Sequence, residues 1–351
     1  MKQSKLNINT TKYEEPELIK ARLDLLLDKF GMLENHVKPA NNYSPRHIFH
    51  DLERAFEAKL SKNEILTMFY NFLKFEESLQ CLKRREFHSG EYIINNIINL
   101  NADYNPAVRA GMDSLFMAVV AYNSYVKGNH QQAIAELSGA IEKAEEQGKS
   151  FPMFYACIQE QWLNKVRVYY KKKDFTTSLA ESVSLIVHSL TGRYRSNPDV
   201  EQGYLLLSSD TRHMMQDHIL NNILRYLSDI PNESGNDFSL NQYKQQLVTG
   251  LAQQLIDEPE QGDNQQALSV LSELYNHKPE AFITGVINNF NAVLNANNSV
   301  QHAIFSELEH LFMHFETEVH THQNYQAFLN YSAELNPESS SVITRQIKEV
   351  A

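Results

Sequence analysis

Apolar residues recur every three or four positions along most of the chain, a spacing that predicts amphipathic α-helices. In the stretch 130–144, Ile134, Leu137 and Ile141 would form one buried stripe. Gly128 and the residue after it predict a tight turn just before this helix. A turn this short places the helix antiparallel to the one that precedes it. No alternating strand pattern is found, so the sequence predicts an all-α fold.

The same arrangement of helix, short turn and helix is predicted twice more. Ser61, with Glu64 three residues later, predicts a capping box that starts the first pair. When the pairs are aligned, Arg85, Gly128 and Lys173 occupy equivalent turn positions, at intervals of 43 and 45 residues. A near-constant interval indicates a repeat, because each helix hairpin needs a neighbour to cover its open face.

These units resemble tetratricopeptide (TPR-like) helix hairpins. In the central pair, the small residues and the turn glycine of the family correspond to Ala121, Ala133, Ala140 and Gly128. In the next pair, Trp162 and Tyr169 match the family's first helix, whereas Lys173 replaces its turn glycine and Ser178 and Leu185 replace its alanines. A further match is Gly262–Leu268, with Ala267 in the small-residue place and Pro279 in the closing-proline place. The resemblance covers residues 65–280, with a period longer than the family's usual length of about 34 residues.

The resemblance implies a right-handed α-solenoid of antiparallel helix hairpins, whose first helices line a concave groove for a protein or peptide ligand. Groove-lining positions would then include Phe75, Leu79, Ala118, Tyr122, Tyr125, Leu163, Arg167 and Tyr170. Tyrosine offers a large contact area with a polar tip, and Arg167 with nearby Lys171 would receive a carboxylate. The candidate peptide- or partner-binding residues are therefore Tyr122, Tyr125, Arg167, Tyr170 and Lys171. The two-carboxylate clamp of the family is not recognisable.

The pattern divides the chain into three regions. Residues 1–62 are expected to form an N-terminal helical cap, with helices near 16–31 and 45–56. Residues 63–231 hold the TPR-like hairpins, and 232–351 form an acidic C-terminal helical region, either more solenoid or a small second domain. The segment 231–237 is the clearest linker candidate, because it combines Pro, Gly, Asn and Ser.

Composition narrows the function classes. The net charge is −11, and residues 232–351 account for it with 15 acidic and 4 basic residues. Nucleic-acid binding needs clustered positive charge, so it is not expected there. Cys81 and Cys157 lie in apolar helical stretches and are expected to be buried, reduced thiols. No signal peptide or long apolar span is evident, which favours a soluble, cytoplasmic protein.

Several features have competing interpretations. The basic run 171–173 is a solvated turn or an anion site. Glu307, His310 and His314 would share one flank of a helix, which suits a transition metal, but the glutamate of an HExxH motif is missing and surface histidines are the default interpretation. No phosphate loop, nucleophile elbow or zinc-cysteine motif is present. We therefore expect no cofactor, no bound metal and no enzymatic activity.

The sequence favours a non-enzymatic scaffold, adaptor or regulator that binds a protein or peptide in the groove. One alternative is a peptide-sensing regulatory switch, transcriptional or phosphatase-inhibitor-like, which would need an effector domain within residues 16–60. Another is a metal-dependent helical enzyme built around His310 and His314. Whether the chain forms a homo-oligomer is left open by the sequence.

Overall fold

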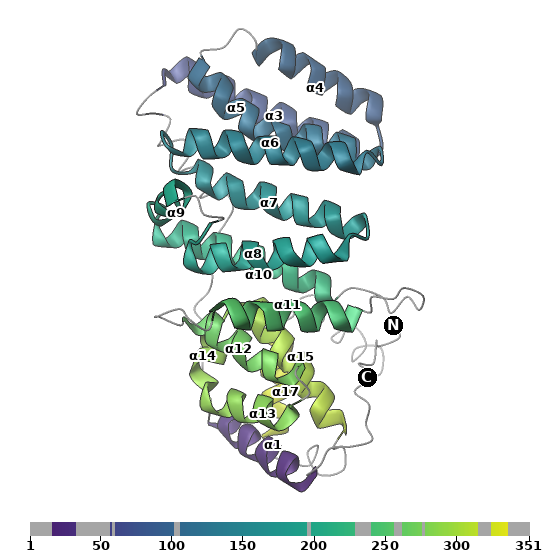
Figure 1. The fold of residues 1–351 in the computed structure, drawn as a ribbon, viewed down its shortest axis with the longest axis vertical. Helices are drawn as coiled ribbons and strands as arrows, with labels where there is room; N and C mark the ends of the chain where they lie inside the picture. Colours follow the sequence, from purple (N-terminus) through teal and green to yellow (C-terminus); the bar gives the residue numbers. More distant parts are fainter. Residues whose placement is uncertain are drawn as a thin grey trace, which may run out of the picture. The chain divides into compact units, whose positions relative to one another are not determined.

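The computed structural model describes residues 16–32, 57, 60–101, 106–194, 198–228, 240–255, 262–275, 278–314 and 324–335. Within these ranges the chain forms fifteen α-helices and no β-strand (Figure 1). The all-α class predicted from hydrophobic periodicity is confirmed. The expected helix at 45–56 and the linker at 231–237 lie outside the described residues.

Contacts between helices group the chain into two compact units. Unit 1 comprises Met1–Asn41 and Leu220–Ala351, and unit 2 comprises Asn42–Ile219. Unit 2 contains α3 (Lys62–Lys83), α4 (Phe87–Asn101), α5 (Pro106–Val126), α6 (His130–Gly148), α7 (Phe154–Lys171), α8 (Phe175–Thr191), α9 (Pro198–Leu205) and most of α10 (Ser209–Ser228). Unit 1 contains α1 (Pro16–Gly31), α11 (Leu240–Leu255), α12 (Asp263–Tyr275), α13 (Pro279–Asn288), α14 (Phe290–Asn295), α15 (Asn298–His314) and α17 (Tyr325–Leu335).

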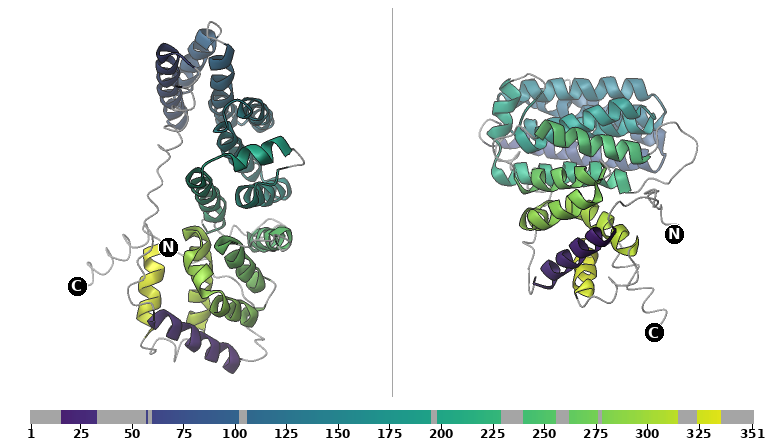
Figure 2. Two further views of the ribbon diagram at one scale, coloured as in Figure 1. Left: turned by 90° about the vertical axis from the view of Figure 1, so that its left-hand side faces the viewer. Right: turned by 60° about the horizontal axis from the view of Figure 1, so that its bottom comes forward.

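Three successive helix pairs, α3–α4, α5–α6 and α7–α8, form at the predicted turns of unit 2. The first pair begins with the predicted capping box, in which Ser61 Oγ accepts from the Glu64 N–H and Glu64 Oε2 accepts from the Ser61 N–H at 2.8 Å. Neighbouring pairs pack side by side, α6 against α7 and α3 against α5. Figure 2 shows the same pairs from two further directions.

All three hairpin turns share one backbone conformation. Arg85, Gly128 and Lys173 have φ angles of 64°, 82° and 65°, all in the left-handed region. In each turn the N–H of this residue donates to the carbonyl three residues earlier, and the next N–H donates to the carbonyl five residues earlier, at 2.9 or 3.0 Å. This is the Schellman arrangement, which satisfies the last carbonyls of the first helix. The second helix begins two residues after the left-handed residue in every pair.

Small residues mark the closest approach within each pair. Gly90, Ala133 and Ser178 each lie five residues after the left-handed residue, and all three are buried. The Ser78 hydroxyl donates to the Gly90 carbonyl at 3.1 Å, and the Ser178 hydroxyl donates to the Val166 carbonyl at 3.4 Å. The equivalent positions of the three pairs therefore have the same packing role, even though their residue types differ.

The N-terminal helix does not follow the division expected from the sequence. Instead of capping the hairpins, α1 packs against α13 and α17 in unit 1, and Figure 2 shows it beside them. Its Phe30 ring lies 5.1 Å from Phe290, 5.5 Å from Phe305 and 5.2 Å from Phe328. Periodicity identifies the buried stripe of α1 but not the helices that cover it, so the expected 1–62 cap differs from the observed unit.

The left-handed turn gives a direct stability test at Gly128, where an added Cβ would meet no atom within 4 Å. The Gly128→Ala change should therefore cost only backbone strain, partly offset by a less flexible unfolded chain. We expect a loss of about 1 kcal/mol in unfolding free energy by urea denaturation. The control is Gly139→Ala, in the interior of α6 at a glycine without a positive φ, which should stabilise the protein by up to about 1 kcal/mol. Equal effects at both sites would contradict the assigned turn.

Candidate functional site

The five residues predicted to bind a partner lie on two neighbouring helices of unit 2. Tyr122 and Tyr125 are in the last turns of α5, and Arg167, Tyr170 and Lys171 are in the last turns of α7. The two helices contact each other directly. The structure therefore places the predicted residues at corresponding ends of adjacent first helices, and we call this surface the α5–α7 face.

The two tyrosines of α5 contact each other, with ring centroids 5.9 Å apart. Tyr125 also lies 5.6 Å from the His130 ring and packs against a buried cluster that includes Ala121, Ala133 and Val168. Its ring therefore helps to hold α5, α6 and α7 together. Tyr122 is partly exposed and is the better candidate for ligand contact.

Arg167 is held by its own helix. Its Nη1 donates to Asn164 Oδ1 at 2.6 Å and lies 3.7 Å from Glu160 Oε1. Glu160 Oε2 in turn lies 2.6 Å from His218 Nε2 on α10. Burial opposes ionisation of Glu160, but the hydrogen bond and charge of His218 and the charge of Arg167 outweigh it, so the Glu160 pKa is lowered. The guanidinium predicted to receive a ligand carboxylate thus already lies beside one.

Tyr170 and Lys171 complete the predicted set. The Tyr170 ring packs edge-on against Phe175 of α8 at 5.4 Å, while Lys171 is exposed. Two other positions expected in the groove, Phe75 and Leu163, are buried instead, and Phe75 stacks on Phe116 at 4.5 Å. Their apolar character serves packing between hairpins, which helical spacing alone does not distinguish from ligand contact.

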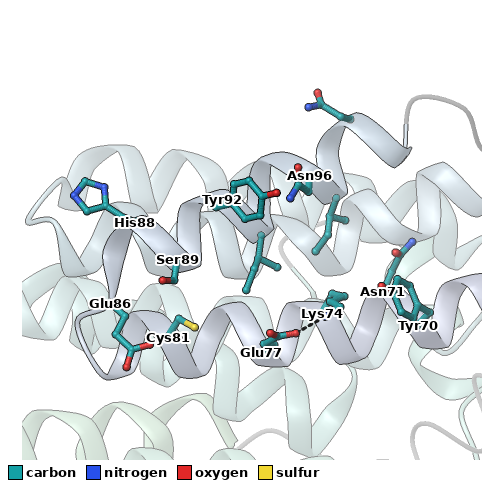
Figure 3. Close-up of a pocket in the computed structure, with 13 residues that line it drawn as sticks. Tyr70, Asn71, Lys74, Glu77, Cys81, Glu86, His88, Ser89, Tyr92 and Asn96 are labelled. Atoms are coloured by element: carbon teal, nitrogen blue, oxygen red, sulfur yellow. Dashed lines mark hydrogen bonds and ion pairs between the residues drawn. The ribbon is translucent and has the colours of Figure 1, made fainter.

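A pocket between α3 and α4 was missed by the sequence reasoning (Figure 3). It has a volume of about 1020 Å³, and its lining includes Tyr70, Asn71, Lys74, Glu77, Cys81 and Tyr92. Lys74 Nζ and Glu77 Oε2 form an ion pair at 2.6 Å in its wall. The sequence offered little signal for this pocket. Tyr70 belongs to an i, i+4, i+7 stripe with Leu66 and Leu73 on α3, but the two leucines do not line the pocket. Such a stripe is normally buried, yet these side chains are 57%, 56% and 66% exposed.

A second polar cluster is buried between α7, α8 and α9. The rings of Trp162, Tyr194 and Tyr204 surround His188, with centroids 4.9 to 6.0 Å from its imidazole. His188 Nδ1 lies 3.0 Å from the Gly192 carbonyl, where its N–H donates. Trp162 Nε1 donates to Glu181 at 2.5 Å. These contacts fix the helices that carry the α5–α7 face rather than forming an open site.

The proposed histidine metal site has little support in the described residues. His310 Nδ1 lies 3.5 Å from the buried Glu307, but the side chain of His314 is outside the description. No group of three His, Cys, Asp or Glu in the described ranges is placed to hold a metal ion. Cys81 and Cys157 are buried and free, as expected, and burial raises the pKa of the Cys157 thiol to about 12.

Comparison with known proteins gives no relative: no family model, no curated protein and no solved structure matches the chain. None of the described helices combines the length and apolar character that crossing a membrane requires.

Burial of His188 predicts a pH dependence of stability. Desolvation lowers its pKa from 6.5 to about 4, so the folded protein keeps the ring neutral while the unfolded chain protonates below pH 6.5. The neutral ring therefore contributes roughly 3 kcal/mol to the unfolding free energy. This contribution is fully present above pH 6.5 and is lost as the pH falls toward 4. Urea unfolding at several pH values, followed by the fluorescence of the only tryptophan, Trp162, measures it.

Two variants distinguish the contribution of His188 to this pH dependence from the contributions of other titrating groups. In His188→Gln the number of protons taken up on unfolding between pH 4 and 6.5 should fall by about one. The reason is that a neutral side chain then occupies the position in both the folded and the unfolded state. His88→Gln, at an exposed position on α4, should leave that dependence unchanged. A His188→Gln protein with the full wild-type pH dependence would contradict the burial argument.

Proposed function

We propose that this protein is a non-enzymatic, TPR-like α-solenoid scaffold or regulator of the cytoplasm that binds a segment of a partner protein on the α5–α7 face. The observation that carries the proposal is the repetition of one hairpin, with the same left-handed turn at Arg85, Gly128 and Lys173. Repeated hairpins stack into extended surfaces, and such surfaces commonly bind peptides or helices of other proteins.

The order of contacts supports a continuous binding face. The first helices of the pairs touch one another directly, α3 with α5 and α5 with α7. A segment lying across them would therefore meet residues from more than one hairpin. In this arrangement affinity comes from several modest contacts, and alteration of a single anchor residue weakens binding without unfolding the scaffold.

The side chains of the face suit a peptide better than a small substrate. Tyr122 offers a partly exposed aromatic ring, and Lys171 offers an exposed positive charge. Along α7, Glu160, Asn164 and Arg167 follow one another at i, i+4 and i+7 and orient each other. Groups that are fixed in this way present donors and acceptors to a ligand without losing much conformational entropy on binding.

The test is affinity capture with the full chain as bait, followed by quantitative mass spectrometry. Tyr122→Ala should reduce recovery of the bound partner at least about fivefold, the loss expected for an aromatic anchor worth about 1 kcal/mol. Lys171→Ala should reduce it less, because an exposed charge contributes little. Thermal unfolding of both variants should stay close to that of the wild type, which shows that the scaffold is intact.

The matched control is Tyr92→Ala, which removes a tyrosine that is 69% exposed on α4, outside the α5–α7 face. Partner recovery should be unchanged by this substitution. If Tyr92→Ala abolishes capture and Tyr122→Ala does not, the ligand lies in the α3–α4 pocket and the assignment to the α5–α7 face is wrong.

A further inference from the structure

The hairpin turns carry positive charge at equivalent positions. The residue before the left-handed one is Arg84, Lys127 or Lys172, and the left-handed residue itself is Arg85, Gly128 or Lys173. All five basic side chains are exposed. Because each turn joins the first helix of a pair to the second, the three turns lie along the same edge of unit 2, on the right in Figure 1. We call Arg84, Arg85, Lys127, Lys172 and Lys173 the turn ridge.

Two members of the turn ridge occupy a conformation that disfavours them. The left-handed region brings the Cβ of an L-residue too close to its own backbone, and glycine avoids this conflict. Gly128 shows that the same hairpin turn accepts glycine. Arg85 and Lys173 nevertheless hold long basic side chains there, with φ angles of 64° and 65°. An unfavourable backbone conformation that persists in a fold points to a role for the residue that adopts it.

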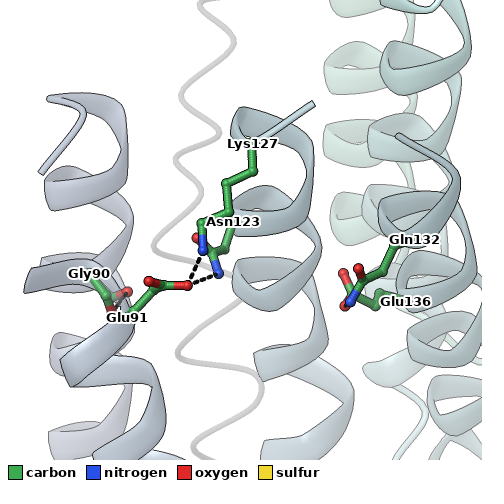
Figure 4. A network of polar contacts seen from close by, with 7 residues as sticks. Gly90, Glu91, Asn123, Lys127, Gln132 and Glu136 are labelled. Carbon is green, nitrogen blue, oxygen red and sulfur yellow. Dashed lines mark hydrogen bonds and ion pairs between the residues drawn. The ribbon is translucent and has the colours of Figure 1, made fainter. Parts of the chain in front are cut away.

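Three of these five charges are available to a partner. Arg85, Lys172 and Lys173 form no ion pair with any described residue. Arg84 contacts Glu86 at 2.9 Å, close to the same turn. Lys127 contacts Glu91 of the preceding pair, whose Oε1 also accepts from Asn123 (Figure 4). Lys127 therefore links two hairpins, while its side chain stays 35% exposed at the edge.

We propose that the turn ridge binds an acidic segment of a partner polypeptide. The turn ridge borders the α5–α7 face, because Lys171 directly precedes Lys172, but it shares no residue with that face and its binding does not depend on what binds there. Adjacent helices pack about 8–10 Å apart. Because the first helices of successive pairs also contact one another, successive turns are separated by roughly 10–20 Å. An extended chain advances about 3.3 Å per residue, so acidic groups about three to six residues apart would meet successive turns.

An acidic polypeptide fits better than a nucleic acid. Carboxylates interrupt the positive charge along the edge, namely Glu86, Glu91 and Asp174. A duplex presents one phosphate charge about every 1.7 Å of its axis and would place phosphates against these carboxylates. A polypeptide can place uncharged residues there. The chain as a whole also carries a net charge of −11, which disfavours attraction of a polyphosphate from a distance.

The test measures fluorescence anisotropy of a fluorescein-labelled peptide of alternating glutamate and serine, about 18 residues long, titrated with the full chain at low salt. The double variant Arg85→Gly/Lys173→Gly should weaken binding roughly 3- to 30-fold, the range expected for the loss of two exposed charge contacts. The same variant should raise the thermal unfolding midpoint by about 2–4 °C, because glycine relieves the backbone conflict at both turns. The proposal thus predicts that the double variant binds the peptide more weakly although it is more stable than the wild type.

Two control variants test whether peptide binding depends on the charges at the turns, rather than on the net charge of the protein or on the backbone conformation of the turns. Lys62→Gly/Lys149→Ser removes two exposed charges from the opposite ends of the hairpins and should leave peptide binding within about twofold. Arg85→Asn/Lys173→Asn removes the turn charges with a residue that tolerates the left-handed region, and should weaken binding like the glycine variant. If the peptide does not bind the wild type, or if all double variants weaken it equally, the proposal is overturned. Tighter binding of a DNA duplex than of the acidic peptide would also overturn it.

Discussion

The hairpins of unit 2 depend on one local interaction, the pair of hydrogen bonds that closes each turn around a left-handed residue. These bonds satisfy the last carbonyls of the first helix and reverse the chain within two residues. The second helix is thereby fixed antiparallel to the first, and a small residue five positions later allows close contact between them. Without this turn, neither the spacing of the pairs nor their common face would be defined.

The binding surfaces that we propose follow from this repetition. Because the turn recurs, the first helices α3, α5 and α7 succeed one another and present Tyr122, Arg167 and Lys171 on adjacent helices. For the same reason the turns form one edge, where Arg85 and Lys173 keep their charge in a conformation that favours glycine. A face with aromatic and polar side chains and an edge with positive charge would suit different parts of a partner chain.

Much of this architecture was predictable from the sequence, because local signals specify it. The equivalence of Arg85, Gly128 and Lys173 followed from the interval between hairpins, although only Gly128 is a residue type that marks a left-handed turn. The location of α1 was not predictable, because its apolar stripe does not identify α13 and α17 as its partners. The internal contacts of Arg167 were missed for a related reason, since His218 is far away in the sequence. The α3–α4 pocket was missed because the sequence does not show where the side chains of two paired helices leave a hollow between them.

The most direct test of the repeated turn and its charge is an NMR titration of protein labelled with ¹⁵N and ¹³C at arginine and lysine. Our account predicts that Arg85 and Lys173 have the backbone chemical shifts of residues in the left-handed region and strong intraresidue HN–Hα nuclear Overhauser cross-peaks, because both have positive φ angles. It also predicts that the acidic peptide shifts the signals of Arg84, Arg85, Lys127, Lys172 and Lys173 together. The account would be contradicted if Arg85 and Lys173 had the backbone chemical shifts of ordinary right-handed helical residues. It would also be contradicted if the peptide changed the signals of lysines spread over the rest of the surface.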